Sequence, residues 1–317
     1  SIPHKRRYVK YLISCVLTFV LPPLKFNPSP MSSIEASPPL PSVVIQPTRG
    51  LSALQLRALW EYRELLYFLV WRDVKVRYKQ TVLGVLWVIL QPLLSTLVFT
   101  VIFGILLEVP SNGLPYPIFA YAGLLPWQYF AGSLTRTSTN LVDNANLITK
   151  VYFPRLVIPL SGVLSGLIDF AVGLILLVVL MLIYRVPLTP AVLLLPLFLL
   201  LGMITALGFG LWLSALNVRF RDIKQLVPFL VQLWMYVTPV IWPVTVIPER
   251  FRSLLALNPM TGVVSGFRWA LLGDSSAITG MQAPVLLFAL SVVIAVVVLV
   301  SGLFFFRSTE RTFADII

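Results

Sequence analysis

The chain of 317 residues is 58% hydrophobic and 11% charged, with a mean hydropathy of +0.91 and a net charge of +12. Soluble domains carry charge on about a quarter of their residues, so this composition excludes a soluble protein and indicates an integral membrane protein. The positive charge fits topology and contact with anionic lipid rather than nucleic acid, because no basic patch alternates with aromatic residues. One cysteine, Cys15, excludes an internal disulfide, and one histidine, His4, leaves no zinc site.

The first 50 residues predict a disordered or non-native N-terminal extension. Basic residues 4–7 precede an apolar run at 11–21, the order found in signal peptides, but the run is about half the length of a membrane span. Prolines at positions 28, 30, 38, 39, 41 and 47 and many serines follow, and such a segment cannot bury enough surface to fold. Met31 leaves open that residues 1–30 are upstream or added sequence.

Residues 51–80 predict an amphipathic helix on the cytoplasmic membrane surface, bent near residues 61–63. Charged side chains from Arg57 to Lys79 recur at helical spacing, and leucines between 59 and 69 occupy another face. The helix ends in the basic sequence Trp71–Gln80, which runs directly into the uncharged stretch Thr81–Leu107. As a helix this stretch is roughly 40 Å long, enough to cross a bilayer. A simple anchor without a partner is the alternative role.

Six membrane spans are expected from the apolar runs, at about residues 81–107, 115–134, 156–184, 191–216, 225–242 and 284–306. The second span carries prolines 117 and 126 and glycines 123 and 132, so we expect it to be kinked or partly broken. Residues 135–152 are too polar for lipid and too helical in spacing for a turn. In the fourth span, Gly202, Gly208 and Gly210 are small enough to allow close helix packing.

The stretch between the fifth and sixth spans, Pro243–Gly280, is irregular and yet apolar. Its prolines and glycines interrupt helices, whereas its Leu, Val, Phe and Trp content exceeds what a loop in water needs. We expect short re-entrant helices in the outer leaflet, shielded by protein. A plain helical hairpin on the outer surface is the alternative.

Basic residues predict the orientation, because Lys and Arg are retained on the cytoplasmic side. With both termini inside, fourteen of them fall on inner segments and four on outer segments, leaving out the first 50 residues. The inner set is Arg57, Arg63, Arg72, Lys75, Arg77, Lys79, Arg136, Lys150, Arg155, Arg219, Arg221, Lys224, Arg307 and Arg311, and the outer set is Arg185, Arg250, Arg252 and Arg268. The polar tail, 307–317, is therefore expected in the cytoplasm.

Enzyme signatures are missing from the sequence, which has no nucleotide-binding Gly-Lys-Ser/Thr loop, no His-Glu-x-x-His and no Asp-x-Asp metal pair. We therefore expect no catalytic residue and no cofactor in this chain, and a partner must supply any energy. Residues 135–155 and 217–225 are polar cytoplasmic segments suited to contact a soluble subunit, although solvated loops are the alternative. Asp169 lies in the third span, where it is either a hydrogen-bonded packing residue or a proton relay.

Four separated motifs resemble one family. They are Tyr78–Gly84 with Trp87 and Gln91-Pro92, then Gly123–Trp127, Asn217–Ile223 and Leu257–Met260. In this order they resemble the polysaccharide-export permeases of ATP-binding cassette transporters, the membrane subunits that export lipid-linked O antigens and teichoic acids. The resemblance covers about residues 55–315.

This resemblance implies a homodimer in the cytoplasmic (inner) membrane of a bacterium, paired with two copies of a cytosolic ATPase that holds ATP and Mg. The substrate would be a polysaccharide linked to undecaprenyl pyrophosphate. Asp143, Asn144 and Lys150 would form the coupling helix on the ATPase, with residues 54–70 as an interface helix beside it. A second cytoplasmic contact would use Arg219, Arg221 and Asp222. At the inner entrance, the substrate's pyrophosphate would meet Arg72, Arg77 and Lys79.

The resemblance also implies a gate in the outer leaflet, which would include Pro248, Asn258 and Pro259. Aromatic side chains stack on many sugars and would suit a polysaccharide channel, although an aromatic belt at the membrane interface explains the same placement. The candidates are Tyr116, Tyr121, Trp127, Tyr129, Phe130, Trp234, Tyr236 and Trp242.

The resulting expectation is an all-α integral membrane protein with four parts: extension 1–50, interface helix 51–80, permease domain 81–306 and tail 307–317. A drug or small-lipid exporter of the same superfamily is the nearest alternative function. A proton-coupled carrier that depends on Asp169 is the alternative from another class.

Overall fold

A computed structural model describes residues 56–79, 84–111, 113–273, 284–310 and 313. The chain divides into two units, Ser1–Arg49 and Gly50–Ile317, and every described residue belongs to the second. The described residues form helices and no strand, which confirms the predicted all-helical class. The expected extension at residues 1–50 and most of the tail beyond Glu310 lie outside the described residues.

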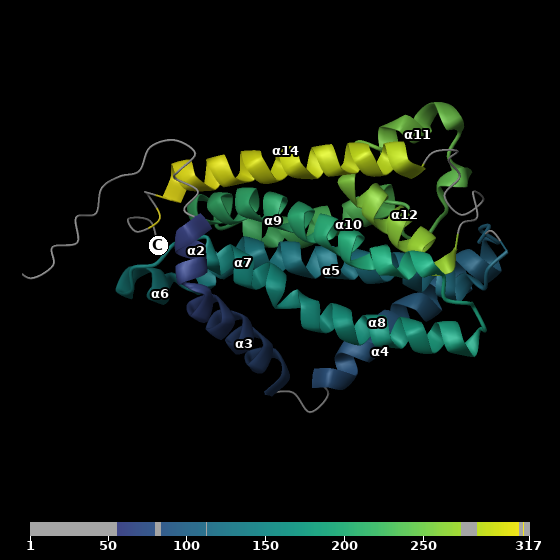
Figure 1. Ribbon diagram of the computed structural model, residues 1–317, viewed down its shortest axis with the longest axis horizontal. Coiled ribbons are helices and arrows are strands. Elements are labelled where there is room, and N and C mark those ends of the chain that lie inside the picture. The colour runs from purple at the N-terminus through teal and green to yellow at the C-terminus, as the bar shows by residue number, and fades with distance from the viewer. Residues whose placement is uncertain (1–55, 80–83, 112, 274–283, 311–312, 314–317) are drawn as a thin grey trace, which may run out of the picture. The chain divides into compact units, whose positions relative to one another are not determined.

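Helices follow one another along the whole described chain (Figure 1). Tyr62 separates the first two helices, at the bend expected near residues 61–63. The helices are α2 (Leu56–Glu61), α3 (Arg63–Lys79), α4 (Gly84–Phe99), η2 (Thr100–Leu106), α5 (Tyr116–Asp143), α6 (Ala145–Lys150), α7 (Val157–Leu164), α8 (Gly166–Ile183), η3 (Pro190–Leu194), α9 (Leu195–Arg219), α10 (Ile223–Val237), η4 (Val244–Val246), α11 (Glu249–Leu255), α12 (Pro259–Leu272) and α14 (Pro284–Glu310).

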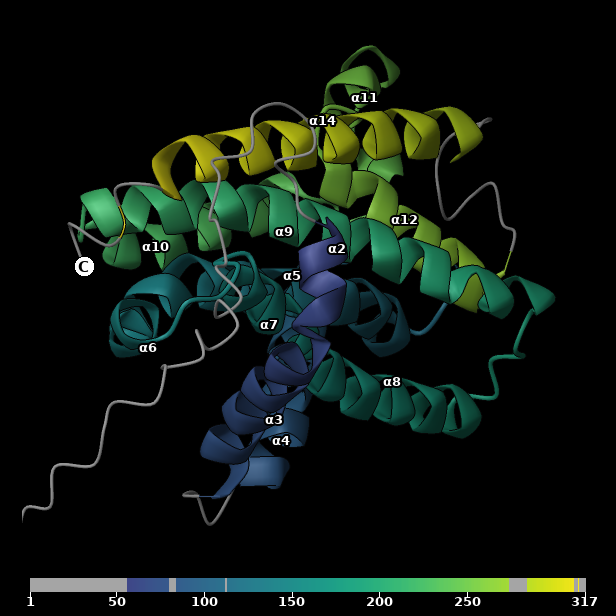
Figure 2. The same ribbon diagram turned by 60° about the vertical axis from the view of Figure 1, so that its left-hand side comes forward.

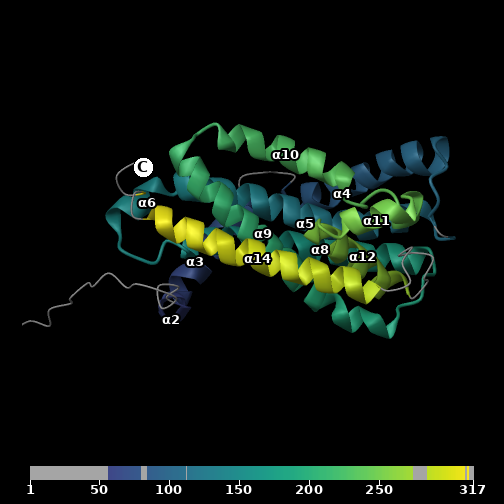
Figure 3. The same ribbon diagram turned by 90° about the horizontal axis from the view of Figure 1, so that it is seen from above.

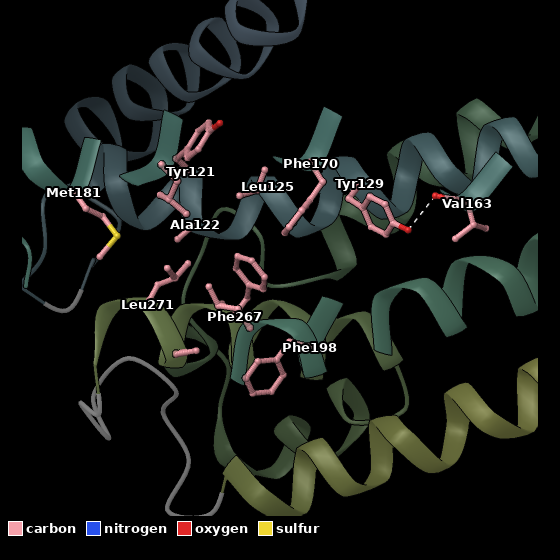
Figure 4. Packing of buried hydrophobic residues seen from close by; sticks show 13 residues of the cluster. Tyr121, Ala122, Leu125, Tyr129, Val163, Phe170, Met181, Phe198, Phe267 and Leu271 are labelled. Atoms are coloured by element: carbon pink, nitrogen blue, oxygen red, sulfur yellow. Dashed lines mark hydrogen bonds between the residues drawn. The ribbon is translucent and has the colours of Figure 1, made fainter. Parts of the chain in front are cut away.

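α5 is the central helix and packs against α7, α8, α9 and α12. In Figure 1, α9 and α14 lie on one side of it and α8 on the other. Most of its residues are buried, from Tyr116 to Leu141. Figure 4 shows side chains of α5 packing with Phe170 of α8, Phe198 of α9 and Phe267 of α12. Because neighbouring helices shield α5, it needs less apolar sequence than a helix surrounded by lipid.

α5 differs from the predicted second span in two ways. It runs through Pro126 without interruption, and it continues to Asp143 instead of ending near Leu134. Hydroxyls in its polar half bond back to the helix, since Thr135 Oγ1 donates to the Ala131 carbonyl at 2.8 Å and Ser138 Oγ to the Thr135 carbonyl at 2.7 Å. The polar segment expected at residues 135–152 is therefore the end of α5 followed by α6.

Four helical stretches are long and apolar enough to cross a membrane: Leu86–Leu106, Val157–Ile183, Pro190–Arg219 and Phe288–Glu310. They correspond to the first, third, fourth and sixth predicted spans. α5 is long enough but less apolar, and α10 has 15 residues, roughly 22 Å, which is short of a hydrocarbon core of about 30 Å. The structure thus supports four spans of the predicted six by length and composition.

The polar connections gather at one end of the helices, which we call the loop end and define as residues 143–155, 219–224 and 307–310 (Figures 1 and 3). Lys224 Nζ lies 3.8 Å from Asp143 Oδ1, and Arg155 Nη1 donates to the carbonyl of Glu310. Residues 184–190 and 244–255 lie at the opposite end. This distribution agrees with the predicted sidedness of the connections relative to one another.

Candidate functional site

Asp169 is the acceptor of an ion-pair cluster formed by three helices. Arg77 Nη1 on α3 donates to Asp169 Oδ2, and the neighbouring Tyr78 hydroxyl donates to Asp169 Oδ1. Arg136 Nη1 on α5 lies 3.5 Å from Asp169 Oδ2. We call these four residues the Asp169 cluster. Two guanidinium groups face one carboxylate, so the cluster carries an excess positive charge.

The path of α3 brings this cluster together. α3 packs against α7 (Figure 2), and the side chains of Arg77 and Tyr78 in its last turn reach Asp169 near the start of α8. Burial of Tyr78, its hydrogen bond to Asp169 and the negative charge of Asp169 together raise the pKa of the Tyr78 hydroxyl to about 12. Tyr78 therefore stays protonated at neutral pH and can donate to the carboxylate.

Arg136 is held in place by three groups, the Gly162 carbonyl, the Ser133 hydroxyl and the Asp169 carboxylate. Its Nε donates to the Gly162 carbonyl at 3.2 Å, and its Nη2 donates to Ser133 Oγ at 3.3 Å. A Cβ at Gly166 would collide with Arg136 Nη2, so the glycine at the start of α8 leaves room for the guanidinium. The sequence singles out Asp169 but gives no sign of this arrangement, because Arg77 and Asp169 are 92 positions apart.

The three residues predicted for the inner entrance have different surroundings. Arg77 belongs to the Asp169 cluster, whereas Arg72 Nη2 lies 2.8 Å from the carboxylate of its neighbour Asp73. Lys79 is exposed at the end of α3. These side chains thus share one helix without converging on a common point.

At the loop end, the two polar segments predicted separately lie side by side through the Lys224–Asp143 pair. Ile148 anchors α6 in a buried cluster, while Lys150 is exposed and Tyr152 is 76% exposed. The residues of the predicted second contact, Arg219, Arg221 and Asp222, are also exposed. Asn144 Nδ2 donates to the Asn140 carbonyl at 2.7 Å and continues the end of α5.

Arg268 on α12 is a buried cation that sequence reasoning placed on an outer segment. It is 3% exposed, and it donates to three main-chain carbonyls, those of Phe119 at 3.2 Å, Pro239 at 2.7 Å and Val240. Its guanidinium lies 3.8 Å from the ring centroid of Phe119. Gly123 leaves the space that this side chain occupies. Arg268 therefore joins α5, α12 and the turn after α10.

Among the residues predicted for the outer gate, Asn258 has a defined role. Its Oδ1 accepts from the Met260 N–H and from Trp234 Nε1, each at 3.0 Å, and its Nδ2 donates to Thr238 Oγ1 at 2.9 Å. Asn258 thus caps α12, with Pro259 at the first helical position. Pro248 is exposed before α11.

The aromatic residues predicted for a channel fall into two groups. Those on α5, which are Tyr116, Tyr121, Trp127, Tyr129 and Phe130, are buried within the chain. Their three tyrosine hydroxyls donate to the carbonyls of Ile241, Gly173 and Val163 and so tie α5 to its neighbours. On and after α10, Trp234 and Trp242 are half-buried and Tyr236 is 51% exposed.

A family model described as ABC-2 type transporter matches residues 64–272, more than half of the chain. The chain belongs to the ABC-2 type transporter family. The matched residues of this ABC-2 chain include the Asp169 cluster, α6 and Arg268, whereas α14 follows them. Among the residues that the structure describes, no group of His, Cys, Asp and Glu could hold a metal ion.

Several curated relatives resemble this ABC-2 chain over most of their length. The O-antigen export system permease protein RfbA of Myxococcus xanthus is 38% identical over 215 residues, which are 67% of this chain and 82% of that protein. A protein of the same name from Klebsiella pneumoniae is 32% identical over 257 residues, 80% of this chain and 95% of that protein. The polysialic acid transport protein KpsM of Escherichia coli is 26% identical over 202 residues, 63% of this chain and 78% of that protein.

Proposed function

We propose that this ABC-2 permease subunit exports a polysaccharide, carried on undecaprenyl pyrophosphate, across the cytoplasmic membrane of a bacterium. The observation that carries the proposal is the match to O-antigen export permeases, which extends over 95% of the length of one of them at 32% identity. The residues that match the family model, 64–272, include the Asp169 cluster, α6 and α12. An O antigen or a teichoic acid type of glycan is the expected cargo.

Energy for export comes from a separate subunit in this proposal. The sequence contains no nucleotide-binding loop, so ATP and Mg bind to two copies of a cytosolic ATPase beneath a homodimer of this chain. The loop end supports this arrangement, because Lys150 at the end of α6 and Tyr152 just after it are exposed in the same region as the Asp143–Lys224 pair. Exposed charged and aromatic side chains on a short anchored helix suit contact with a soluble partner.

Substrate enters at the last turns of α3 in this proposal. The pyrophosphate is an anion, and Arg72, Arg77 and Lys79 lie within three helical turns before the chain continues toward α4. Single replacement of each by Gln tests the role. Lost export with normal membrane insertion supports the entrance, whereas unchanged export in all three leaves these residues as topological anchors.

The glycan leaves through an outer gate formed by η4, α11 and α12. α12 packs against α5, α9 and α14, so protein shields the interrupted backbone around it, as a re-entrant helix requires. The exposed Tyr236 and half-buried Trp234 and Trp242 are the aromatic residues best placed to meet a sugar chain. In this proposal α5 is one of the two remaining crossings, and α10 together with residues 238–242 after it is the other, which gives six crossings with both termini in the cytoplasm.

Reconstitution tests the proposal directly. The permease and its cognate ATPase are placed in proteoliposomes, and radiolabelled undecaprenyl-pyrophosphate-linked glycan is followed from the ATPase side to the opposite side. ATP-dependent transfer is expected, and an ATPase variant without its nucleotide-binding lysine serves as the control. Transfer that persists without the ATPase would overturn the proposal, and so would ATP-dependent movement of a drug or a short lipid in place of the glycan.

A further inference from the structure

The Asp169 cluster has more positive charge than its own carboxylate can neutralise. Arg77 and Arg136 come from different helices and both face Asp169 Oδ2. A carboxylate offers two oxygens and one charge, and Tyr78 takes the other oxygen. One carboxylate therefore serves three donors from α3 and α5.

Of the three donors, Arg136 lies farthest from the Asp169 carboxylate. Its separation of 3.5 Å from Asp169 is long for a hydrogen bond between charged groups, which is normally about 2.7–2.9 Å. Two of its nitrogens are held by Gly162 and Ser133, so Nη1 points toward Asp169 with its orientation fixed. A group with more oxygens and more charge than a carboxylate could place an acceptor within hydrogen-bond distance of Arg136 and still accept from Arg77.

The cluster is accessible, in contrast to the other arginine-centred site. The side chains of Arg77, Arg136 and Asp169 are 29%, 23% and 27% exposed. Arg268 is 3% exposed, and main-chain carbonyls take its donors. A ligand can therefore approach the Asp169 cluster, whereas the Arg268 site is closed by protein.

We infer that the Asp169 cluster is a binding site for a phosphate-type anion, in which Asp169 occupies the place of that anion while the site is empty. Phosphate oxygens displace the carboxylate and accept from both Arg77 and Arg136, since guanidinium forks match phosphate geometry. Asp169 then acts as a built-in competitor that sets the affinity. Its displacement also releases the Tyr78 hydrogen bond and with it the polar link between α3 and α8.

This inference rests on the proposed function for the source of the anion, which is the headgroup of a lipid-linked substrate. It adds Arg136 and Asp169, which lie on α5 and α8, to the entrance residues of α3. It also gives Asp169 a role other than proton transfer.

Equilibrium binding to the permease alone tests the inference. The full chain is placed in nanodiscs of phosphatidylcholine, and inorganic pyrophosphate is titrated against it. Asp169→Asn should raise the affinity for pyrophosphate about tenfold, because it removes the competing charge, and Arg136→Gln should lower it about tenfold. Arg136→Lys should recover part of the loss, since Lys keeps the charge without the fork.

A matched control is Glu310→Gln, which removes another partly buried carboxylate paired with an arginine, at the end of α14. It should leave the affinity for pyrophosphate unchanged. Tyr78→Phe tests the same inference if Asp169→Asn fails to fold. It removes the hydrogen bond from Tyr78 to Asp169, so the carboxylate is displaced more easily and the affinity for pyrophosphate should rise about threefold. Unchanged or lower affinity in both Asp169→Asn and Tyr78→Phe would overturn the inference.

A competition experiment with a phosphate-bearing lipid tests whether the anion is a lipid headgroup. Nanodiscs that also contain phosphatidic acid should show weaker pyrophosphate binding, because the lipid phosphate competes at the same arginines. Absence of competition would overturn the assignment to a lipid headgroup. These measurements need no ATPase and no glycan, so their failure leaves the proposed export function standing and is distinguishable from the failure of export itself.

Discussion

Two charged residues that lie in apolar sequence, Asp169 and Arg268, are neutralised in different ways. Asp169 finds side-chain partners, whereas Arg268 finds backbone carbonyls at the turn after α10. Buried charge without partners costs several kcal/mol, so each arrangement stabilises a particular contact between helices. Sequence reasoning located Asp169 because a carboxylate in a span is conspicuous. It gave no partner for either residue, because Phe119 and Arg268 are 149 positions apart and no local pattern joins them.

Replacing Arg268 tests the carbonyl arrangement. Arg268→Met should destabilise the protein by about 3 kcal/mol, because it removes the side-chain donor from the buried carbonyls of Pro239 and Val240, which lie outside a helix, and a second donor from the Phe119 carbonyl within α5. Arg268→Lys should cost less, since Lys retains a donor but cannot reach all three acceptors. The measurement is thermal unfolding of the purified protein, followed by size-exclusion chromatography.

Arg250→Met is the control for this prediction, because Arg250 is exposed on α11. It should leave the melting temperature close to that of the wild type. An Arg268→Met variant as stable as the control would contradict the role given to the guanidinium.

At the scale of elements, the contact between α9 and α14 depends on glycine. A Cβ at Gly208 would lie 2.8 Å from the backbone nitrogen of Leu299, and a Cβ at Gly302 would lie 2.5 Å from the carbonyl oxygen of Gly208. The two backbones therefore approach too closely for any side chain between them. The sequence predicted small packing positions at Gly202, Gly208 and Gly210, but it could not separate them, because the partner helix is distant in sequence.

Gly208→Ala should destabilise the protein by about 1–3 kcal/mol, since α14 must move to accommodate the methyl group. Gly202→Ala is the matched control on the same helix, where the nearest atom to a new Cβ is Val263 Cγ1 at an ordinary 3.6 Å. That control should be neutral or slightly stabilising, by up to about 1 kcal/mol. Equal melting temperatures of the two variants would count against the close approach of α9 and α14.

α6 is the element for which the proposed coupling can be separated from folding. Asp143 and Lys224 form an exposed pair, which contributes at most about 1 kcal/mol to stability. Asp143→Lys together with Lys150→Glu should leave the fold intact and raise the number of ATP molecules hydrolysed per molecule exported. The measurement is parallel ATPase and transport assays in proteoliposomes.

An exchange of charges gives the control for coupling. Asp143→Lys with Lys224→Asp restores the internal pair but reverses the charges that a partner meets. Coupling should remain impaired in this exchange if the ATPase contacts the loop end. Full recovery of coupling would instead assign Asp143 to the internal pair alone.

Sequence patterns predict elements well where the apolar run is the dominant signal. The spans around α8, α9 and α14 follow directly from such runs, and their helices meet the length and composition of a membrane span. α5 was harder, because its polar half reads as a separate segment until its neighbours are known. Arg136, Ser133 and Ser138 tolerate their position in α5 because neighbouring helices and backbone carbonyls supply partners, and this depends on tertiary structure.

For the whole molecule, the charges at the two ends predict the orientation in the membrane. Cations of the described residues at the loop end are Lys150, Arg155, Arg219, Arg221, Lys224 and Arg307, and those at the opposite end are Arg185, Arg250 and Arg252. Arg268 is removed from the outer count, because its charge is buried among carbonyls and does not face water. Without Arg268 the difference in charge between the two ends is larger, and because basic residues are retained on the cytoplasmic side, we predict that the loop end is cytoplasmic.

Single cysteines placed at the two ends report this orientation. In a Cys15→Ser background, Tyr152→Cys marks the loop end and Leu188→Cys the opposite end, at positions 76% and 57% exposed. A membrane-impermeant maleimide applied to intact spheroplasts should label Leu188→Cys and spare Tyr152→Cys, and permeabilised cells should label both. The reverse pattern would place the loop end outside and remove the proposed ATPase contact, because a cytosolic subunit could not then reach α6.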